Sequence, residues 1–236
     1  MTDTGTRLEG GGTSGSRSRR ADDWLADIRI SYDTVADSYS DYTRVALAGE
    51  PYLLAALALF ADLVHAAGGG PVADVGCGPG HVTAHLHKLG VDAFGVDLSP
   101  AMIDIARREH PDLRFEVGSM TDLQLADASI TALLAFWSLI HIPDDEIPAV
   151  LSHFRRVLRP DGPLLLGFHV GDESRLKTEG YGGHPMKVYV HRRQPDRMAT
   201  WLRDAGFTVK AQMLLGLDES LPGAVLFAHR RQEGAN

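Results

Sequence analysis

A glycine-rich turn between an apolar run and a helical pattern constrains this chain more than any other stretch. Residues 72–75 are an apolar run that predicts a buried strand, and a helical pattern covers residues 82–89. Glycines stand at alternate positions between them, at Gly76, Gly78 and Gly80. Glycine permits a tight turn and the close approach of a ligand, and the unpaired N–H groups at the start of a helix face that ligand. The stretch therefore predicts a nucleotide-type binding site.

The spacing of the glycines differs from the dinucleotide fingerprint G-x-G-x-x-G/A. Counting from Gly76 places His81 where that fingerprint needs a small residue, and the sequence holds no Tyr-x-x-x-Lys pair. An NAD-dependent oxidoreductase or epimerase is therefore a poor interpretation. A serine hydrolase is equally poor, because Ser138 does not lie in a G-x-S-x-G elbow.

Acidic residues on both sides of the turn, Asp74 before it and Asp97 after it, strengthen the prediction of a nucleotide site. Asp97 ends the next predicted strand, residues 91–97, about twenty residues beyond the glycine turn. A carboxylate in that place can accept hydrogen bonds from both hydroxyls of a ribose. Ser99 and Pro100 then open a helix as its N-cap and first residue.

These two stretches resemble the class I S-adenosylmethionine-dependent methyltransferases. The first motif of that family looks like Val-Ala-Asp-Val-Gly-Cys-Gly-Pro-Gly at residues 72–80, and its second acidic strand like Gly-Val-Asp-Leu-Ser at residues 95–99. An Arg-Pro-Asp-Gly turn at residues 159–162 adds to the match, which extends over about residues 22–229. The resemblance implies an α/β fold, a Rossmann-like three-layer sandwich. Its seven-stranded sheet is mostly parallel, with an antiparallel C-terminal hairpin and an N-terminal helical lid.

The resemblance also implies S-adenosyl-L-methionine as the cofactor and assigns residues to it. The loop 76–80 would hold the methionine part, Asp97 the ribose, and Ser119 and Met120 the adenine. A Tyr-Asp-x-x-Ala-x-x-Tyr segment is similar to the lid of small-molecule methyltransferases, although an aromatic stripe at helical spacing also fits simple core packing. The expected cofactor-binding residues are Tyr32, Tyr39, Asp74, Gly76, Cys77, Gly78, Gly80, Asp97, Leu98, Met102, Ser119, Met120, Phe136 and Trp137.

Two histidines are the candidate catalytic residues. His141 and His169 follow two predicted strands, residues 130–136 and 164–168, and ligands of open α/β sheets bind beyond the carboxyl ends of the strands. Histidine titrates near neutral pH and can act as a general base, although either residue could instead only form hydrogen bonds at a strand end. Base catalysis contributes roughly 10²–10⁴-fold, whereas orientation contributes about 7–11 kcal/mol. We therefore expect positioning of the acceptor to dominate.

A metal site is not expected from the sequence. His81, His85 and His87 stand close together on one predicted helix, and such spacing can bind a metal ion. No cysteine pair or third carboxylate ligand follows at motif distance, so the pattern favours an exposed helix face.

Composition limits the partners and the compartment. The chain has 236 residues, a net charge of −8 and a pI of about 5.7, which disfavours a nucleic-acid backbone as partner. Its one cysteine, Cys77, cannot form an internal disulfide and fits a reducing compartment. No secretory signal or membrane-spanning apolar run is found, so the expected location is cytoplasmic, without membrane contact.

The expected organisation is one domain with a tail. Residues 1–21 are rich in Gly, Ser, Thr and Arg and predict a disordered tail, native or a start-site artefact. Residues 22–236 form the methyltransferase domain, in which the polar segment 171–186 is a flap or insertion over the substrate side. We expect methyl transfer to an oxygen or nitrogen of a small molecule by a monomer or homodimer. The alternatives are a tRNA or protein methyltransferase and a non-catalytic nucleotide-binding protein of the same fold.

Overall fold

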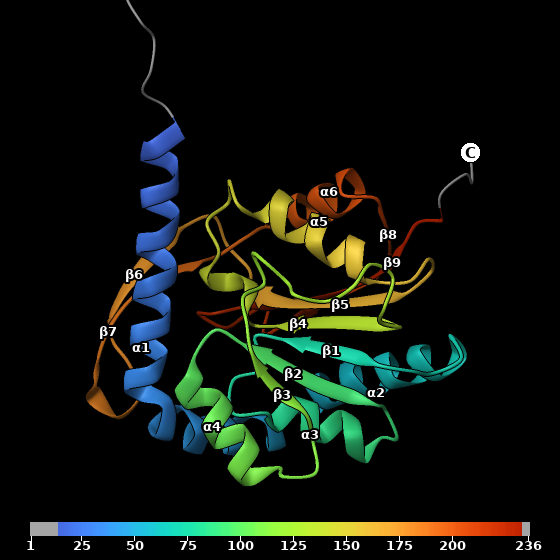
Figure 1. The fold of residues 1–236 in the computed structure, drawn as a ribbon, viewed down its shortest axis with the longest axis horizontal. Coiled ribbons are helices and arrows are strands. Elements are labelled where there is room, and N and C mark those ends of the chain that lie inside the picture. Colours follow the sequence, from blue (N-terminus) through green and yellow to red (C-terminus); the bar gives the residue numbers. More distant parts are fainter. Residues whose placement is uncertain (1–13, 233–236) are drawn as a thin grey trace, which may run out of the picture.

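The computed structural model describes the backbone of residues 14–232 and the side chains of residues 23–232. A seven-stranded sheet forms its centre (Figure 1), with the strand order β3-β2-β1-β4-β5-β9-β8. The strands are β1 Val72–Val75, β2 Ala93–Asp97, β3 Phe115–Val117, β4 Ala132–Phe136, β5 Pro163–His169, β8 Phe207–Leu215 and β9 Gly223–Arg230.

The sheet has the expected parallel core and antiparallel end. Strand β1 pairs in parallel with β2 and β4, so that Val72 lies opposite Ala93 on one side and Ala132 on the other. Strands β5, β9 and β8 pair antiparallel at the opposite edge. The predicted mostly parallel seven-stranded sheet with a C-terminal hairpin is therefore confirmed.

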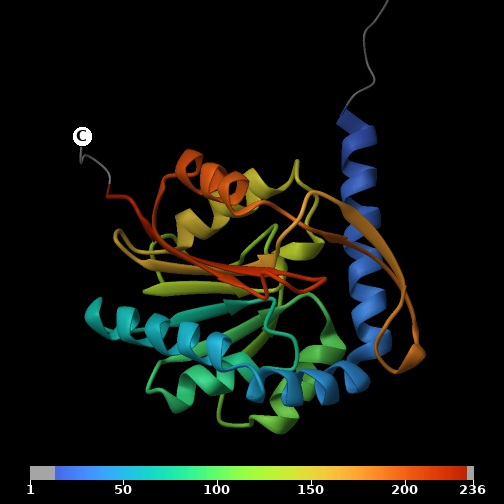
Figure 2. The ribbon, with the colours of Figure 1, turned by 180° about the vertical axis from the view of Figure 1, so that it is seen from behind.

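Helices cover both faces of the sheet and complete the three layers (Figures 1 and 2). One face carries α2 Pro51–Ala66, α3 His81–Lys88 and α4 Pro100–Glu109, and the other carries α5 Ile147–Val157 and α6 Pro195–Asp204. Strands buried on both faces are expected to be apolar throughout. Accordingly all four residues of β1 are buried, as are the first four of β4.

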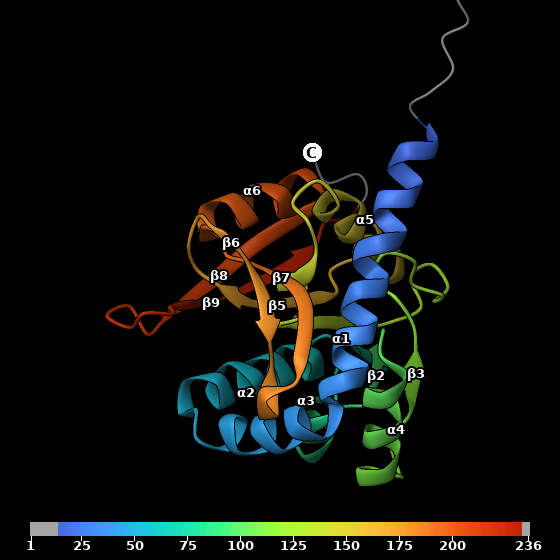
Figure 3. The ribbon, with the colours of Figure 1, turned by 90° about the vertical axis from the view of Figure 1, so that its left-hand side faces the viewer.

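A long helix, α1 Ser14–Ala48, stands beside the sandwich together with a two-stranded hairpin (Figure 3). The hairpin consists of β6 Ser174–Glu179 and β7 Pro185–His191. Ser31 Oγ of α1 accepts a 2.8 Å hydrogen bond from the Lys187 backbone N–H, and the Lys187 Nζ lies 2.8 Å from an Asp27 carboxylate oxygen. The polar segment 171–186 therefore contains the first strand and the turn of a hairpin that packs on α1.

The N-terminal end of α1 differs from the expected tail. Helix α1 begins at Ser14, so residues 14–21 are helical, whereas the sequence predicted a disordered tail over residues 1–21. A helix adds one hydrogen bond for each residue once it is nucleated, so a segment without an apolar face can extend an existing helix. Residues 1–13 of the expected tail lie outside the described residues.

Among the described residues, no single helix is both long and apolar enough to cross a membrane. Helices α1 and α2 meet the length and composition requirement only as a pair bent by 83°.

Candidate active site

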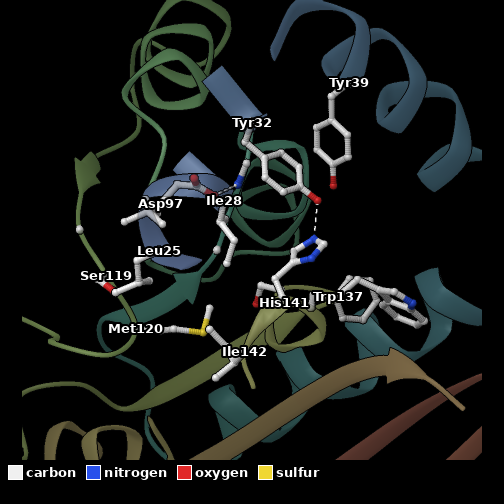
Figure 4. A pocket seen from close by; sticks show the side chains of 16 residues that line it. Leu25, Ile28, Tyr32, Tyr39, Asp97, Ser119, Met120, Trp137, His141 and Ile142 are labelled. Atoms are coloured by element: carbon white, nitrogen blue, oxygen red, sulfur yellow. Dashed lines mark hydrogen bonds between the residues drawn. The ribbon is translucent and has the colours of Figure 1, made fainter. Parts of the chain in front are cut away.

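A cavity lies where the carboxyl ends of β1, β2 and β4 approach α1 (Figure 4). This is the point where the strand order reverses, between β1 and β4, at which open α/β sheets bind ligands. The cavity is lined by Leu25, Ile28, Tyr32, Tyr39, Gly76, Gly78, Asp97, Leu98, Gly118, Ser119, Met120, Phe136, Trp137, Ser138, His141 and Ile142.

The glycine turn forms one wall of the cavity because side chains are excluded there. Gly76 has φ +79°, and a Cβ on it would lie 2.2 Å from the Cβ of Ser138. Gly78 has φ +53° and faces Tyr39, and both glycines line the cavity. Gly80 plays a different part, since a Cβ there would lie 2.7 Å from the ring of Phe115. It permits α3 to start close to β3 and does not line the cavity.

Asp97, at the end of β2, presents an acceptor to the cavity. Its Oδ2 accepts a 2.8 Å hydrogen bond from the Gly78 N–H, and its Oδ1 accepts one of 2.8 Å from the Ser99 N–H. Burial raises the pKa of Asp97, while these backbone donors act in the opposite direction. A carboxylate has about four lone-pair positions, so both oxygens keep acceptor capacity for a diol.

Three more of the expected cofactor residues lie below the turn and do not line the cavity. Asp74 is 1% exposed, and its Oδ2 accepts a 2.7 Å hydrogen bond from the Thr83 hydroxyl. Burial raises the pKa of Asp74 to about 7. Cys77 packs against Gly95 and Phe115, and Met102 is fully buried. These three side chains support the turn and the base of α4, because the core behind a sharp turn must be filled.

Tyr32 and His141 form a hydrogen-bonded pair across the cavity (Figure 4). The Tyr32 Oη lies 2.6 Å from His141 Nε2, and His141 Nδ1 lies 2.8 Å from the backbone oxygen of Tyr189 on β7. A carbonyl oxygen can only accept, so Nδ1 carries the proton of the neutral imidazole. Nε2 therefore accepts the hydrogen bond that Tyr32 donates.

Burial keeps both members of the pair neutral. It lowers the pKa of His141 to about 4 and raises the pKa of the Tyr32 hydroxyl well above its ordinary value. His141 is 7% exposed and belongs to a short 3₁₀ helix, η1 Leu139–His141, directly after β4. The pair thus brings a proton donor from α1 to an acceptor at the end of β4.

His169 lies behind the wall of the cavity, so its expected role as a general base is not supported by its position. Its Nδ1 accepts a 3.3 Å hydrogen bond from Trp137 Nε1, and it does not line the cavity. Trp137 has φ +56°, a conformation that costs a non-glycine residue energy and occurs at functional sites. The glycine at 167 leaves room for the indole, since a Cβ there would lie 2.5 Å from it. His169 therefore holds the Trp137 ring in place.

The sequence reasoning missed five residues that line the cavity. Leu25 lies three residues before Ile28, and Ile28 lies four residues before Tyr32, so the three side chains share one helical face. The sequence alone contains this pattern. Ser138 packs on Gly76, and Ile142 follows His141. Nothing local to those two positions, or to Gly118, indicates that they reach the cavity.

Comparisons with known proteins agree with this geometry. A family model described as a methyltransferase domain matches residues 72–162. A ubiquinone biosynthesis O-methyltransferase of Xanthomonas axonopodis pv. citri is 28% identical over 158 residues, which cover 60% of this chain and 64% of that protein. A demethylmenaquinone methyltransferase of Paenarthrobacter aurescens is 25% identical over 228 residues, which cover 88% and 86% of the two chains.

A solved structure shows the same fold over nearly the whole chain. The 1,6-didemethyltoxoflavin-N1-methyltransferase of Burkholderia thailandensis, solved with 1,6-didemethyltoxoflavin and S-adenosylhomocysteine, has a TM-score of 0.63 and 22% identity. The match covers 95% of this chain and 94% of that one.

Fold, glycine turn and sequence matches together define the class. The matched family model and the relatives support a class I S-adenosylmethionine-dependent methyltransferase, a family whose cofactor is S-adenosylmethionine. The Xanthomonas relative is matched over only 64% of its length, just under two thirds.

Proposed function

We propose that this protein transfers the methyl group of S-adenosylmethionine to an oxygen or nitrogen of a small-molecule acceptor. The observation that carries the proposal is that Asp97, the glycine turn and the Tyr32–His141 pair line the same cavity. The names of the relatives, which act in ubiquinone and menaquinone biosynthesis, support a small molecule as acceptor.

The residues at one end of the cavity fit the cofactor. Asp97 would accept the ribose hydroxyls, and Leu98, Ser119 and Met120 would surround the adenine. The backbone of the glycine turn would hold the methionine part. When bound, the cofactor supplies an electrophilic methyl group on its sulfonium.

At the other end, Tyr32 and His141 would hold and relay the proton of the acceptor. Tyr32 Oη would take the proton from the acceptor hydroxyl while its own proton passes to His141 Nε2. The resulting imidazolium is stabilised because Nδ1–H already donates to the Tyr189 carbonyl. A pKa of about 4 makes His141 a weak base. It therefore takes the proton only after attack has begun to make that proton acidic.

Enclosure of the reacting groups contributes more than the base. Helix α1 contributes Leu25, Ile28 and Tyr32 to the lining of the cavity, and these side chains would reduce the access of water to the reacting groups. Holding the acceptor in line with the methyl group contributes about 7–11 kcal/mol, against roughly 10²–10⁴-fold from a general base.

Transfer of a radioactive methyl group tests the proposal. The protein is incubated with methyl-labelled S-adenosylmethionine and three fractions of a cell extract: small molecules, bulk tRNA and proteins. We expect label in the small-molecule fraction, and much less with His141→Gln. Label in tRNA or protein would replace the proposal by its first alternative. Binding of the cofactor without label in any fraction would favour a non-catalytic nucleotide-binding protein.

A further inference from the structure

A cluster of metal-ligating side chains lies at the start of α3 and the end of α4, and none of its residues lines the cavity. His81 opens α3, while Glu109 ends α4 and His110 follows it. One donor atom from each of the three residues lies within 4.8 Å of the donors of the other two. All three residues are partly buried.

Both histidines have a nitrogen that is available to a ligand. His110 Nε2 is buried and has no hydrogen-bond partner among the described residues, which is unfavourable for a polar atom. His81 Nε2 lies 3.1 Å from the backbone oxygen of Ser40 and must donate to it, so Nδ1 of the neutral ring keeps its lone pair.

The carboxylate of the cluster is held in a fixed orientation. Its two oxygens accept hydrogen bonds of 2.8 and 2.9 Å from Arg44 on α1. Further lone pairs on Glu109 remain free for a cation, and a partner of this kind orients a ligand in the same way as outer-shell groups of known sites.

We propose that His81, Glu109 and His110 form a binding site for a divalent transition-metal ion of the Zn²⁺ class. Two imidazoles and one carboxylate are a ligand set that Zn²⁺ uses, with water in the fourth position. Ligand bonds of about 2.1 Å place tetrahedral donors about 3.4 Å apart, so the side chains must close in slightly.

The proposed metal site lies between helix α1 and the glycine turn, residues 76–80. Ser40 and Arg44 of α1 contact His81 and Glu109, and His81 directly follows Gly80. An ion at this point would join α3 to α4 beneath the C-terminal part of α1. The sequence predicted an exposed helix face for His81, His85 and His87. It did not indicate a metal site because the other two proposed ligands, Glu109 and His110, lie at the end of α4 and not on the same helix.

Titration of Zn²⁺ into the metal-free chain, carrying no affinity tag, tests the proposal. Calorimetry should show one ion bound per chain, with a rise in Tm. Co²⁺ should give the visible absorption of a tetrahedral site. Replacement of one ligand, in His110→Gln or Glu109→Gln, should weaken Zn²⁺ binding by about tenfold or more. The Tm of each metal-free variant shows that it is folded.

The other histidines of α3 provide the controls. His87→Gln, at an exposed position of the same helix, should bind Zn²⁺ as the parent does. His85→Gln should also leave the affinity unchanged. Absence of binding by the parent would overturn the proposal. An equal loss with His85→Gln or His87→Gln would do the same, because the ion would then sit on the surface of α3.

Discussion

At the scale of single residues, the Tyr32–His141 pair shows what sequence reasoning reaches and what it misses. Both residues were expected at the site, Tyr32 beside the cofactor and His141 as a base. Their hydrogen bond joins positions 109 residues apart, and it exists only because α1 lies over the end of β4. No local pattern encodes that contact. The same applies to His169, whose partner, Trp137, lies on another strand end.

Removing either member of the pair should slow methyl transfer. For His141→Gln we expect kcat to fall by roughly 10²–10⁴-fold, since the proton acceptor is lost. The kcat of Tyr32→Phe should also fall, because the proton can no longer pass from the acceptor through Tyr32 to His141. His169→Gln is the matched control and should retain most of the activity. Steady-state kinetics with the acceptor found in the labelling experiment provides the measurement. A larger loss in His169→Gln than in His141→Gln would contradict the assignment.

The pH dependence of the reaction should reflect the burial of His141. Because burial lowers its pKa to about 4, the imidazole stays neutral and able to accept a proton well below its ordinary range. The acid limb of kcat/KM should therefore lie near pH 4 and not near pH 6.5. An acid limb near pH 6.5 that disappears in His141→Gln would contradict this account, because it would show that His141 titrates like an exposed histidine.

Asp74 should make the protein less stable as the pH rises. Burial raises its pKa in the folded state to about 7, above its unfolded value of about 3.9. The folded state then binds more protons between these two values, so the free energy of unfolding decreases from about pH 4 to pH 7. Asp74→Asn should flatten this dependence in denaturant titrations, whereas the exposed Asp112→Asn should not. An unchanged slope in Asp74→Asn would contradict the account.

At the scale of elements, the sequence predicted the parallel core of the sheet but not the pairing of β6 with β7 in the hairpin beside α1. Strand β4 is a continuous apolar run, β1 is apolar apart from Asp74, and the glycine turn marks where β1 ends, so local sequence suffices there. Strand β6 is exposed on both sides and has no alternation to detect. Strand β7 alternates between exposed and buried residues and reads as a strand from the sequence, but nothing in the sequence indicates that it pairs with β6. The hairpin is held mainly by contacts with α1, which sequence periodicity does not reveal.

The packing of the Trp137 ring against Gly167 of β5 should be sensitive to one added methyl group. A Cβ at Gly167 would lie 2.5 Å from the indole, so Gly167→Ala should lower the free energy of unfolding by about 1–3 kcal/mol. Gly49→Ala is the control, because its Cβ would have no neighbour closer than 3.7 Å. Urea titration followed by tryptophan fluorescence measures both. Equal stabilities of the two variants would show that the ring has room to move.

At the scale of the whole molecule, the account depends on one arrangement. The sheet brings the glycine turn and Asp97 to one end of the cavity, and α1 closes the other side over His141 (Figure 4). The sequence predicted the sheet and the cofactor end, because these depend on short motifs. It did not predict which side chains of α1 enter the cavity, since that depends on how a separate helix packs.

The central claim is that Asp97 and the glycine turn bind S-adenosylmethionine, and calorimetric titration tests it most directly. The parent chain should bind S-adenosylmethionine and not NAD. Asp97→Asn should bind it roughly 10–100-fold more weakly, as expected for the loss of hydrogen bonds to a charged group. Asp92→Ala, exposed near the start of the same strand, should bind it like the parent. Binding of NAD instead, or equal affinity in Asp97→Asn, would contradict the account.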